Sequence, residues 1–309
     1  MKNGRKEQSS TIPEYENAIE IRGLCKRYDG FSLRDVDLVV PRGSIMGFVG
    51  QNGAGKTTTI QAVLNLIRKE EGSIRVLGLD HAEQENVIKE RVAAVFDEIP
   101  FHDMLTPRQL SLVLEGIYAR WQPQVFQGYL DRFGLPQKKK IGQLSKGMKM
   151  KLQIAAALSR QAELLIMDEA TAGLDPVVRG EMLRVFLEYM QDENHSILMS
   201  SHITSDLEKI ADSVTYIHQG RILLSGDKED ILSRHGLLRC RKADLEQVEP
   251  RDCISTHRTE YGADVLVADR ELCRRKYPRI LLEAATLDEI LLYYVRAGEH
   301  EGGRREWTL

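Results

Sequence analysis

Cysteine is scarce in this sequence, and no stretch of it is long and apolar enough to cross a membrane. The 309 residues include four cysteines, Cys25, Cys240, Cys253 and Cys273, with no CxxC pair among them. Such spacing argues against a zinc site or a disulfide-stapled secreted scaffold and favours a reducing compartment. Because no run of about 18 apolar residues and no N-terminal apolar region is present, we expect a chain that is neither secreted nor inserted in a bilayer.

The sequence also lacks an excess of either charge sign. Lysine and arginine number 43 against 46 acidic residues, which leaves a formal charge of −3. This balance gives no general attraction to nucleic acid, so we expect no nucleic-acid partner. The length suits one large domain with a small appended one, because single cores stop growing near roughly 250–300 residues.

The pattern of apolar residues predicts a mixed architecture. Residues 1–16 are polar, and we expect them to form a flexible leader. Between residues 18 and 40 apolar and polar residues roughly alternate around Asp29-Gly30, as in an antiparallel layer. Short apolar runs that end in polar residues then indicate buried parallel strands, which makes the core α/β. These runs are residues 44–49, 92–96, 164–167 and 197–199.

Three further segments complete the expected organisation. Helical spacing without a strand signal predicts a helical insert at about residues 104–150. Residues 213–225 are expected to form two strands around a turn, which closes a main domain of residues 17–236. Residues 237–309 then form a small α+β extension, with a strand at 264–268 and a last helix opened by the capping box Thr286-x-x-Glu289.

A glycine-rich loop between an expected strand and helix fits the pattern GxxxxGK[ST]. Its glycines allow backbone N–H groups to surround phosphate oxygens at a helix N-terminus, and an accidental glycine-rich turn would lack this context. Lys56 is expected to bridge the β and γ phosphates, and Thr57 to offer a hydroxyl to Mg²⁺. The predicted nucleotide-binding residues here are Gly50, Gln51, Asn52, Gly53, Ala54, Gly55, Lys56, Thr57 and Thr58.

Two acidic residues follow the buried run at 164–167. An unpaired carboxylate at the end of a buried strand is costly unless a metal or another partner meets it. We expect Asp168 to serve Mg²⁺ through water, and Glu169 to accept a proton from the attacking water as a general base. The alternative is a strand end with solvated acids, which the nearby phosphate loop disfavours.

Further motifs make the sequence resemble the ABC ATPases over residues 17–236. Leu144-Ser145-Lys146-Gly147-Met148 resembles their signature sequence, and residues 172–176 resemble their D-loop. The resemblance implies a P-loop NTPase cassette with a mostly parallel sheet, an antiparallel β layer and a helical insert. It implies catalytic roles for Lys56, Glu169 and the switch histidine His202, and nucleotide contacts from Tyr28, Ser145, Gly147 and Asp175.

In that family two cassettes pair head to tail, which implies a second cassette, identical or different, as a partner. Ser145 and Gly147 of one chain would then complete the γ-phosphate site of the other. This sequence departs from the family at the loop that usually carries glutamine, where Glu98 is expected to ligate the metal and Asp97 is the alternative. Lys146 and Met148 replace the commoner glycine and glutamine, and Ala170 replaces a usual proline.

Three short segments resemble those of ATPase subunits of bacterial exporters for drugs and antimicrobial peptides: LSKGMKMK, FDE and LDEILLYYV. This implies ATP and Mg²⁺ as cofactors and a membrane-spanning permease that docks around residues 98–110. The chain would then lie at the cytoplasmic face of the membrane, attached through the permease.

Two other functions remain as alternatives. A soluble ABC protein that acts on ribosomes or DNA is disfavoured, because such proteins carry a second cassette or long coiled-coil or zinc insertions that this chain lacks. A non-catalytic ATP switch is disfavoured because Glu169 and His202 are both present.

Overall fold

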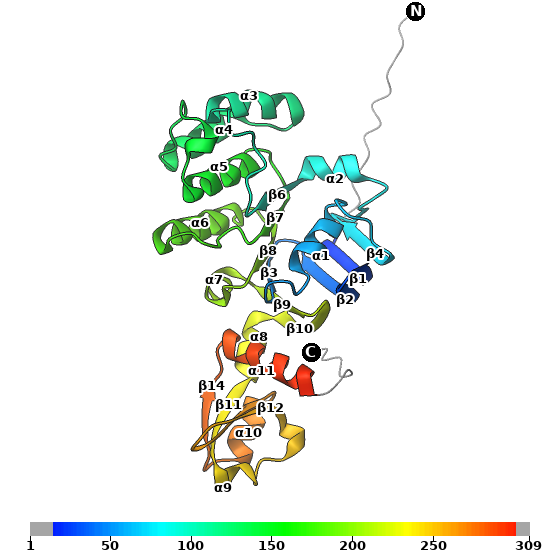
Figure 1. Cartoon of the computed structure of the whole chain (residues 1–309), viewed down its shortest axis with the longest axis vertical. Helices are drawn as coiled ribbons and strands as arrows, with labels where there is room; N and C mark the ends of the chain where they lie inside the picture. Colours follow the sequence, from blue (N-terminus) through cyan, green and yellow to red (C-terminus); the bar gives the residue numbers. More distant parts are fainter. Residues whose placement is uncertain (1–14, 301–309) are drawn as a thin grey trace, which may run out of the picture.

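In the computed structural model, which describes residues 15–300, these residues form three β-sheets: the first two lie side by side, and the third lies at the lower end of Figure 1. Most of the predicted leader, residues 1–14, lies outside the described residues. The first sheet is antiparallel, in the order β2-β1-β4-β5. Its strands are β1 (Asn17–Tyr28), β2 (Phe31–Pro41), β4 (Glu71–Val76) and β5 (Leu79–Asp80).

The second sheet is the parallel core that the apolar runs predicted. It has the order β10-β9-β3-β8-β7-β6, and all its neighbours are parallel except β10 and β9. Every residue of β3, β7 and β8 is buried, so their sequences are apolar runs instead of alternating patterns. The strands are β3 (Ile45–Val49), β6 (Val92–Phe96), β7 (Leu164–Asp168), β8 (Ser196–Ser201), β9 (Ser213–His218) and β10 (Arg221–Asp227).

A close backbone contact joins these two sheets at the turn between β9 and β10. Gln219 and Gly220 both have positive φ, which confirms the turn expected there. A Cβ at Gly220 would lie 1.9 Å from the carbonyl oxygen of Ser32, so only glycine fits. Arg34 N donates to the Gly220 carbonyl at 2.8 Å, which fixes β2 against the core sheet.

The helices cover the core sheet and form the insert. α3 begins with the capping box of Thr106 and Gln109, and it lies with α4 at the far end from the extension in Figure 1. The approximate end of the predicted insert, residue 150, falls within α5, whose second half is buried. The helices up to this point are α1 (Lys56–Val63), α2 (Glu85–Arg91), α3 (Pro107–Ile117), α4 (Pro123–Arg132), η1 (Ile141–Gln143) and α5 (Lys146–Leu158).

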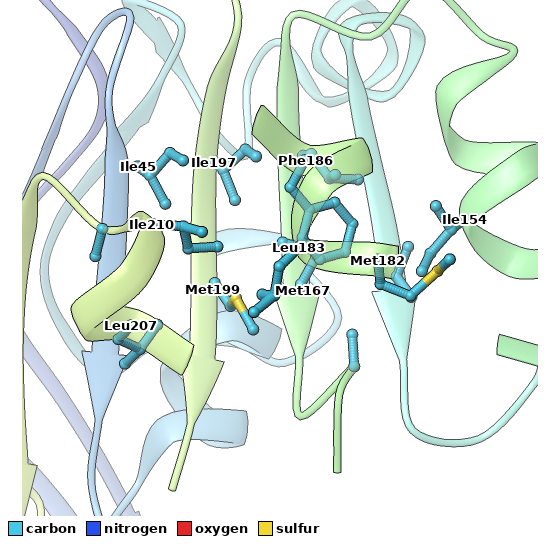
Figure 2. Close-up of a cluster of buried hydrophobic side chains, with 14 of the residues drawn as sticks. Ile45, Ile154, Met167, Met182, Leu183, Phe186, Ile197, Met199, Leu207 and Ile210 are labelled. Atoms are coloured by element: carbon cyan, nitrogen blue, oxygen red, sulfur yellow. The ribbon is translucent and has the colours of Figure 1, made fainter. Parts of the chain in front are cut away.

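A continuous apolar core joins the sheet to α6 (Pro176–Tyr189) and α7 (Thr204–Ile210). Figure 2 shows side chains of these two helices directed at the strands. None of the helices within residues 15–300 combines the length and apolarity that crossing a bilayer requires. The labelled side chains of this core are Ile45, Ile154, Met167, Met182, Leu183, Phe186, Ile197, Met199, Leu207 and Ile210.

The third sheet, in the order β12-β13-β11-β14, forms the extension. The strand expected at 264–268 is β13, and three strands of this sheet were not anticipated. A separate small core beneath α10 includes Leu238, Val265 and Cys273. The elements are α8 (Lys228–Arg234), β11 (Gly236–Arg241), α9 (Lys242–Leu245), η2 (Pro250–Asp252), β12 (Cys253–Arg258), β13 (Gly262–Val267), α10 (Arg270–Lys276), β14 (Leu281–Ala284) and α11 (Leu287–His300).

The last helix, α11, packs onto the core of its own chain. Its capping box is present, since Thr286 N and Oγ1 donate to Glu289 Oε2 and Glu289 N donates to Thr286 Oγ1. Ile290 belongs to the same buried cluster as the core of α6 and α7. Buried His235 contacts Tyr294 Oη at 3.0 Å, and burial lowers the pKa of this histidine, so its neutral form links α8 to α11.

Replacement of Ile290 by alanine is expected to destabilise the whole chain, because this side chain is fully buried in the main core. The free energy of unfolding should fall by about 2–5 kcal/mol, as for other buried aliphatic truncations. Leu292→Ala is the matched control, since Leu292 on the same helix is 47% exposed. Denaturant unfolding of both variants checks this, and equal stability of the two would contradict the packing of α11.

Candidate nucleotide site

The phosphate loop lies between β3 and α1, as the sequence predicted. Gly53 and Gly55 have φ of +78° and +116°, in the region that favours glycine. A Cβ at Gly50 would lie 2.5 Å from the Ile217 carbonyl oxygen, so side chains are excluded there too. The loop therefore turns tightly over the carboxyl ends of the strands and presents its backbone N–H groups at the start of α1, an arrangement suited to phosphate.

Lys56 lies inside this loop. Its side chain is only 5% exposed, and its ammonium donates to the carbonyl oxygens of Gly50 at 2.6 Å and Gln51 at 3.2 Å. The same nitrogen lies 3.0 Å from Glu169 Oε1, at ion-pair distance. Lys56 and Glu169, the acid that follows β7, thus face the same space.

Glu169 follows directly after β7 in an unusual backbone conformation. Its φ is +53°, in the left-handed region, a conformation that costs a non-glycine residue about 1–3 kcal/mol and persists only where its surroundings enforce it. Ser200 of β8 supplies that constraint, because Glu169 N donates to Ser200 Oγ at 3.0 Å and to the Ser200 carbonyl at 3.3 Å. Ser200 Oγ in turn donates to Asp168 Oδ1 at 2.6 Å. One hydroxyl therefore positions both acids.

His202 completes the group from the end of β8. Its Nδ1 lies 2.7 Å from Glu169 Oε2, and because a carboxylate only accepts, Nδ1 carries the donated proton. Its side chain is 46% exposed, in contrast to the 18% of Glu169. The carboxylate of Glu169 is thus held between an ammonium and an imidazole, with one oxygen in contact with each.

The oxygen donors near the loop suit a hard divalent cation. Asp168 is 7% exposed, and Thr57 stands at the start of α1 with its side chain exposed. Within residues 15–300 no cluster of three or more histidine, cysteine or acidic side chains could hold a metal by itself. A cation here would need further oxygens from a phosphate and from water, as Mg²⁺ prefers. Thr59, which the sequence analysis missed, secures the first turn of α1 by donating to the Gly55 carbonyl at 2.9 Å.

The loop after β6 begins next to Asp168, because Phe96 pairs with Asp168 in the sheet, but its acids make other contacts. Asp97 forms an ion pair with Lys146 at 2.6 Å, and Glu98 is exposed. Within the described residues no hydrogen bond or ion pair joins the side chain of Glu98 to Thr57 or Asp168. In the sheet, β8 and β7 separate β6 from the strand of the phosphate loop.

Tyr28 lies at the end of β1, in the turn that leads to Phe31. It is 47% exposed and pairs across the turn with Phe31. The ring of Phe31 lies 3.0 Å from the position that a Cβ of Gly55 would take, so this turn covers the loop. Phe31 was not anticipated as a neighbour of the site, because one aromatic residue in an alternating strand carries no distinguishing signal.

The remaining predicted residues form a second group at two helix N-termini. Ser145 caps α5 by accepting from Met148 N at 3.3 Å, and Asp175 caps α6 by accepting from Val177 N and Val178 N. A Cβ at Gly147 would lie 3.9 Å from Val178, so these two helix starts are adjacent. The structure therefore gathers Lys56, Asp168, Glu169 and His202 in one place and Ser145, Gly147 and Asp175 in another.

Comparison with known proteins identifies the family of the chain. A sequence profile of the family described as "ABC transporter" matches residues 33–172. The bacitracin transport ATP-binding protein BcrA of Bacillus licheniformis is 38% identical over 216 residues, which cover 69% of each chain. The daunorubicin/doxorubicin resistance ATP-binding protein DrrA of Streptomyces peucetius is 31% identical over 239 residues, 74% of this chain and 72% of that one. A solved ATP-binding subunit of an ABC transporter superposes with a TM-score of 0.64 at 28% identity, over 69% of this chain and 91% of its own.

Ser200→Ala should weaken metal-dependent nucleotide binding, because it removes the hydroxyl that positions Asp168 and the backbone of Glu169. Loss of such a supporting group typically costs about 10–100-fold in metal affinity. Titration of Mg²⁺ in the presence of a fluorescent ATP analogue measures this. Ser159→Ala is the control, since that buried hydroxyl only caps the end of α5 through the Ala155 carbonyl. Equal Mg²⁺ affinity in the two variants would contradict the role of Ser200.

Proposed function

This chain belongs to the ABC transporter family as an ATP-binding, ATP-hydrolysing subunit, and we propose that it powers export through a separate membrane permease by ATP-driven pairing of two cassettes. The observation that carries the catalytic part is the position of Glu169. Its carboxylate lies 3.0 Å from the loop lysine and 2.7 Å from His202, at the edge where the phosphate loop ends.

The residues of the first group divide the chemistry among them. The phosphate loop binds the triphosphate with its backbone N–H groups, and Lys56 offers a positive charge to its terminal oxygens. Glu169 accepts the proton of the attacking water, and His202 holds its carboxylate in place. Thr57 and Asp168 would hold Mg²⁺, and Glu98 would be a further ligand if its loop moved toward them. Bound Mg²⁺ would neutralise charge on the phosphates. Tyr28 offers a flat face to adenine.

The second group supports the proposal that a second cassette completes the site. Ser145, Gly147 and Asp175 stand on adjacent helix starts, with no hydrogen bond to the phosphate loop within the described residues. The hydroxyl of Ser145 and the absence of a side chain at Gly147 suit the approach of a terminal phosphate presented by another copy. The partner cassette is either a second copy of this chain or a related chain. Closure on ATP and reopening after hydrolysis would then drive the membrane partner.

A groove beside the insert suits contact with a permease at the cytoplasmic face of the membrane. It has a volume of about 790 Å³ and lies between the loop after β6 and the first turns of α5. Its lining combines charged with apolar side chains, including Ile99, Phe101, Leu144 and Met150. Relatives named for bacitracin transport, lantibiotic transport and daunorubicin/doxorubicin resistance support the proposal of an exporter of amphiphilic compounds.

Glu169→Gln should nearly abolish ATP hydrolysis and leave ATP binding intact, because the amide cannot accept the proton of water. The expected loss in kcat is about 10²–10⁴-fold, the usual contribution of a general base. Phosphate release and binding of a fluorescent ATP analogue measure the two properties separately. Glu193→Gln, on an exposed loop, is the control. Undiminished phosphate release by Glu169→Gln would overturn its assignment as the base.

Affinity purification of the tagged Glu169→Gln chain from gently solubilised membranes tests the transport function. With ATP present, a polytopic membrane protein is expected to co-purify in stoichiometric amount, and omission of ATP serves as the comparison. Recovery of ribosomes or DNA without a membrane protein would instead support a soluble ABC protein and overturn the transport proposal.

A further inference from the structure

Lys146 stands between Ser145 and Gly147 and begins α5. Its ammonium lies 2.6 Å from Asp97 Oδ1, and the two side chains are 52% and 48% exposed. It also borders the loop that leads to α6, because a Cβ at Gly173 would lie 3.3 Å from Lys146 Nζ. An accessible positive charge therefore lies on the same surface as both helix starts of the second group.

This ion pair is not what holds α5 to the loop after β6. Gln153, two turns further along the helix, is buried and forms hydrogen bonds with the backbone of that loop. Phe96 N donates to Gln153 Oε1 at 3.2 Å, and Gln153 Nε2 donates to the carbonyls of Phe96 at 2.9 Å and Glu98 at 3.4 Å. Half-exposed ion pairs stabilise a fold little, so the pair of Lys146 and Asp97 can break without loosening the helix.

A terminal phosphate would compete well with Asp97 for this ammonium. It carries more negative charge than a carboxylate and offers three acceptor oxygens. If two copies close on the nucleotide, water leaves the interface and charge interactions strengthen. Lysine has a long flexible stem, so its ammonium can change partner without movement of the backbone.

We propose that Lys146 is a further nucleotide-binding residue, whose ammonium leaves Asp97 and contacts the terminal phosphate held by the opposite cassette when two cassettes close. This inference rests on the pairing of cassettes proposed above and adds a residue and a change of partner to it. Asp97 then acts as a competitor for Lys146 that favours the separated chains.

The competing explanation is a fixed clamp in which the ion pair only braces the signature segment. The two explanations predict opposite effects of Asp97→Asn on closure of the two cassettes. If the pair is a clamp, loss of either partner weakens closure to a similar extent. If Lys146 changes partner, Lys146→Gln weakens closure whereas Asp97→Asn strengthens it, because the neutral amide competes less for the ammonium.

The experiment measures ATP-dependent self-association of the full chain by sedimentation, with Glu169→Gln in every variant so that hydrolysis does not reopen the pair. Lys146→Gln is expected to raise the dissociation constant about tenfold or more, as loss of a charge-assisted contact to phosphate does. Asp97→Asn should lower the dissociation constant severalfold, and Lys146→Arg should keep most of the affinity. In the double variant Asp97→Asn should bring no gain, because the ammonium is absent.

Lys149→Gln is the matched control, since Lys149 lies on the same helix and pairs with Asp103 at 3.6 Å; it should leave association unchanged. Equal weakening by Lys146→Gln and Asp97→Asn, or no effect of either, would overturn the exchange of partners while the pairing of cassettes stands. If the Glu169→Gln chain alone stays monomeric with ATP, the homodimeric pairing fails, and the inference fails with it. Thermal melting of each variant shows whether it is folded.

Discussion

The register of β7 against β8 determines where the candidate catalytic groups lie. In this parallel pair Asp168 stands opposite Ser200, which places the serine hydroxyl beside the carboxylate and beside the N–H of Glu169. A slip of one residue would turn that hydroxyl to the other face of the sheet and leave both acids without their shared partner. β8 also pairs with β3, Ser201 opposite Val49, so the end that carries His202 lies next to the phosphate loop. The register of β7 with β8 and that of β8 with β3 thus bring the loops after these three strands to one edge of the sheet. This edge is the place where open α/β sheets bind ligands.

Glu169 shows how this edge enforces a conformation that its own sequence disfavours. A glutamate rarely adopts a positive φ, and nothing local requires it here. The two hydrogen bonds from its N–H to Ser200 hold the backbone in place. As a result, its carboxylate points back over the phosphate loop toward Lys56 instead of into solvent. The strain is thus located at the residue that we propose as the proton acceptor, where a fixed orientation would be useful.

Much of the fold could be predicted because its signals are local. Buried parallel strands are visible as apolar runs, and the glycine-rich loop and the capping box at Thr286 have fixed spacings. β4 was missed because only Ile74 and Val76 of its residues are buried, which leaves too short an alternation. Two strands of the extension were missed for a similar reason, since β14 has no buried residue and β12 has only one.

The contacts of the site depended on tertiary structure and could not be predicted from the sequence. The positioning role of Ser200 follows from strand register, and a serine at the end of a strand has no pattern of its own. The ion pair of Asp97 with Lys146 joins segments about 50 residues apart, so the loop's acids could be named but not their partners. Glu98 as a metal ligand stays a prediction.

His202 illustrates why such positions depend on the core and not on the side chain itself. At 46% exposure, packing constrains its ring little, so its place must come from the backbone on either side. On one side is β8, buried along its whole length. On the other is α7, where buried Asp206 accepts from Thr171 Oγ1 at 3.1 Å. Glu208 of the same helix accepts from Leu287 N of α11 at 2.9 Å. The exposed imidazole is therefore held between a core strand and a helix that is fixed both to the segment after Glu169 and to the extension.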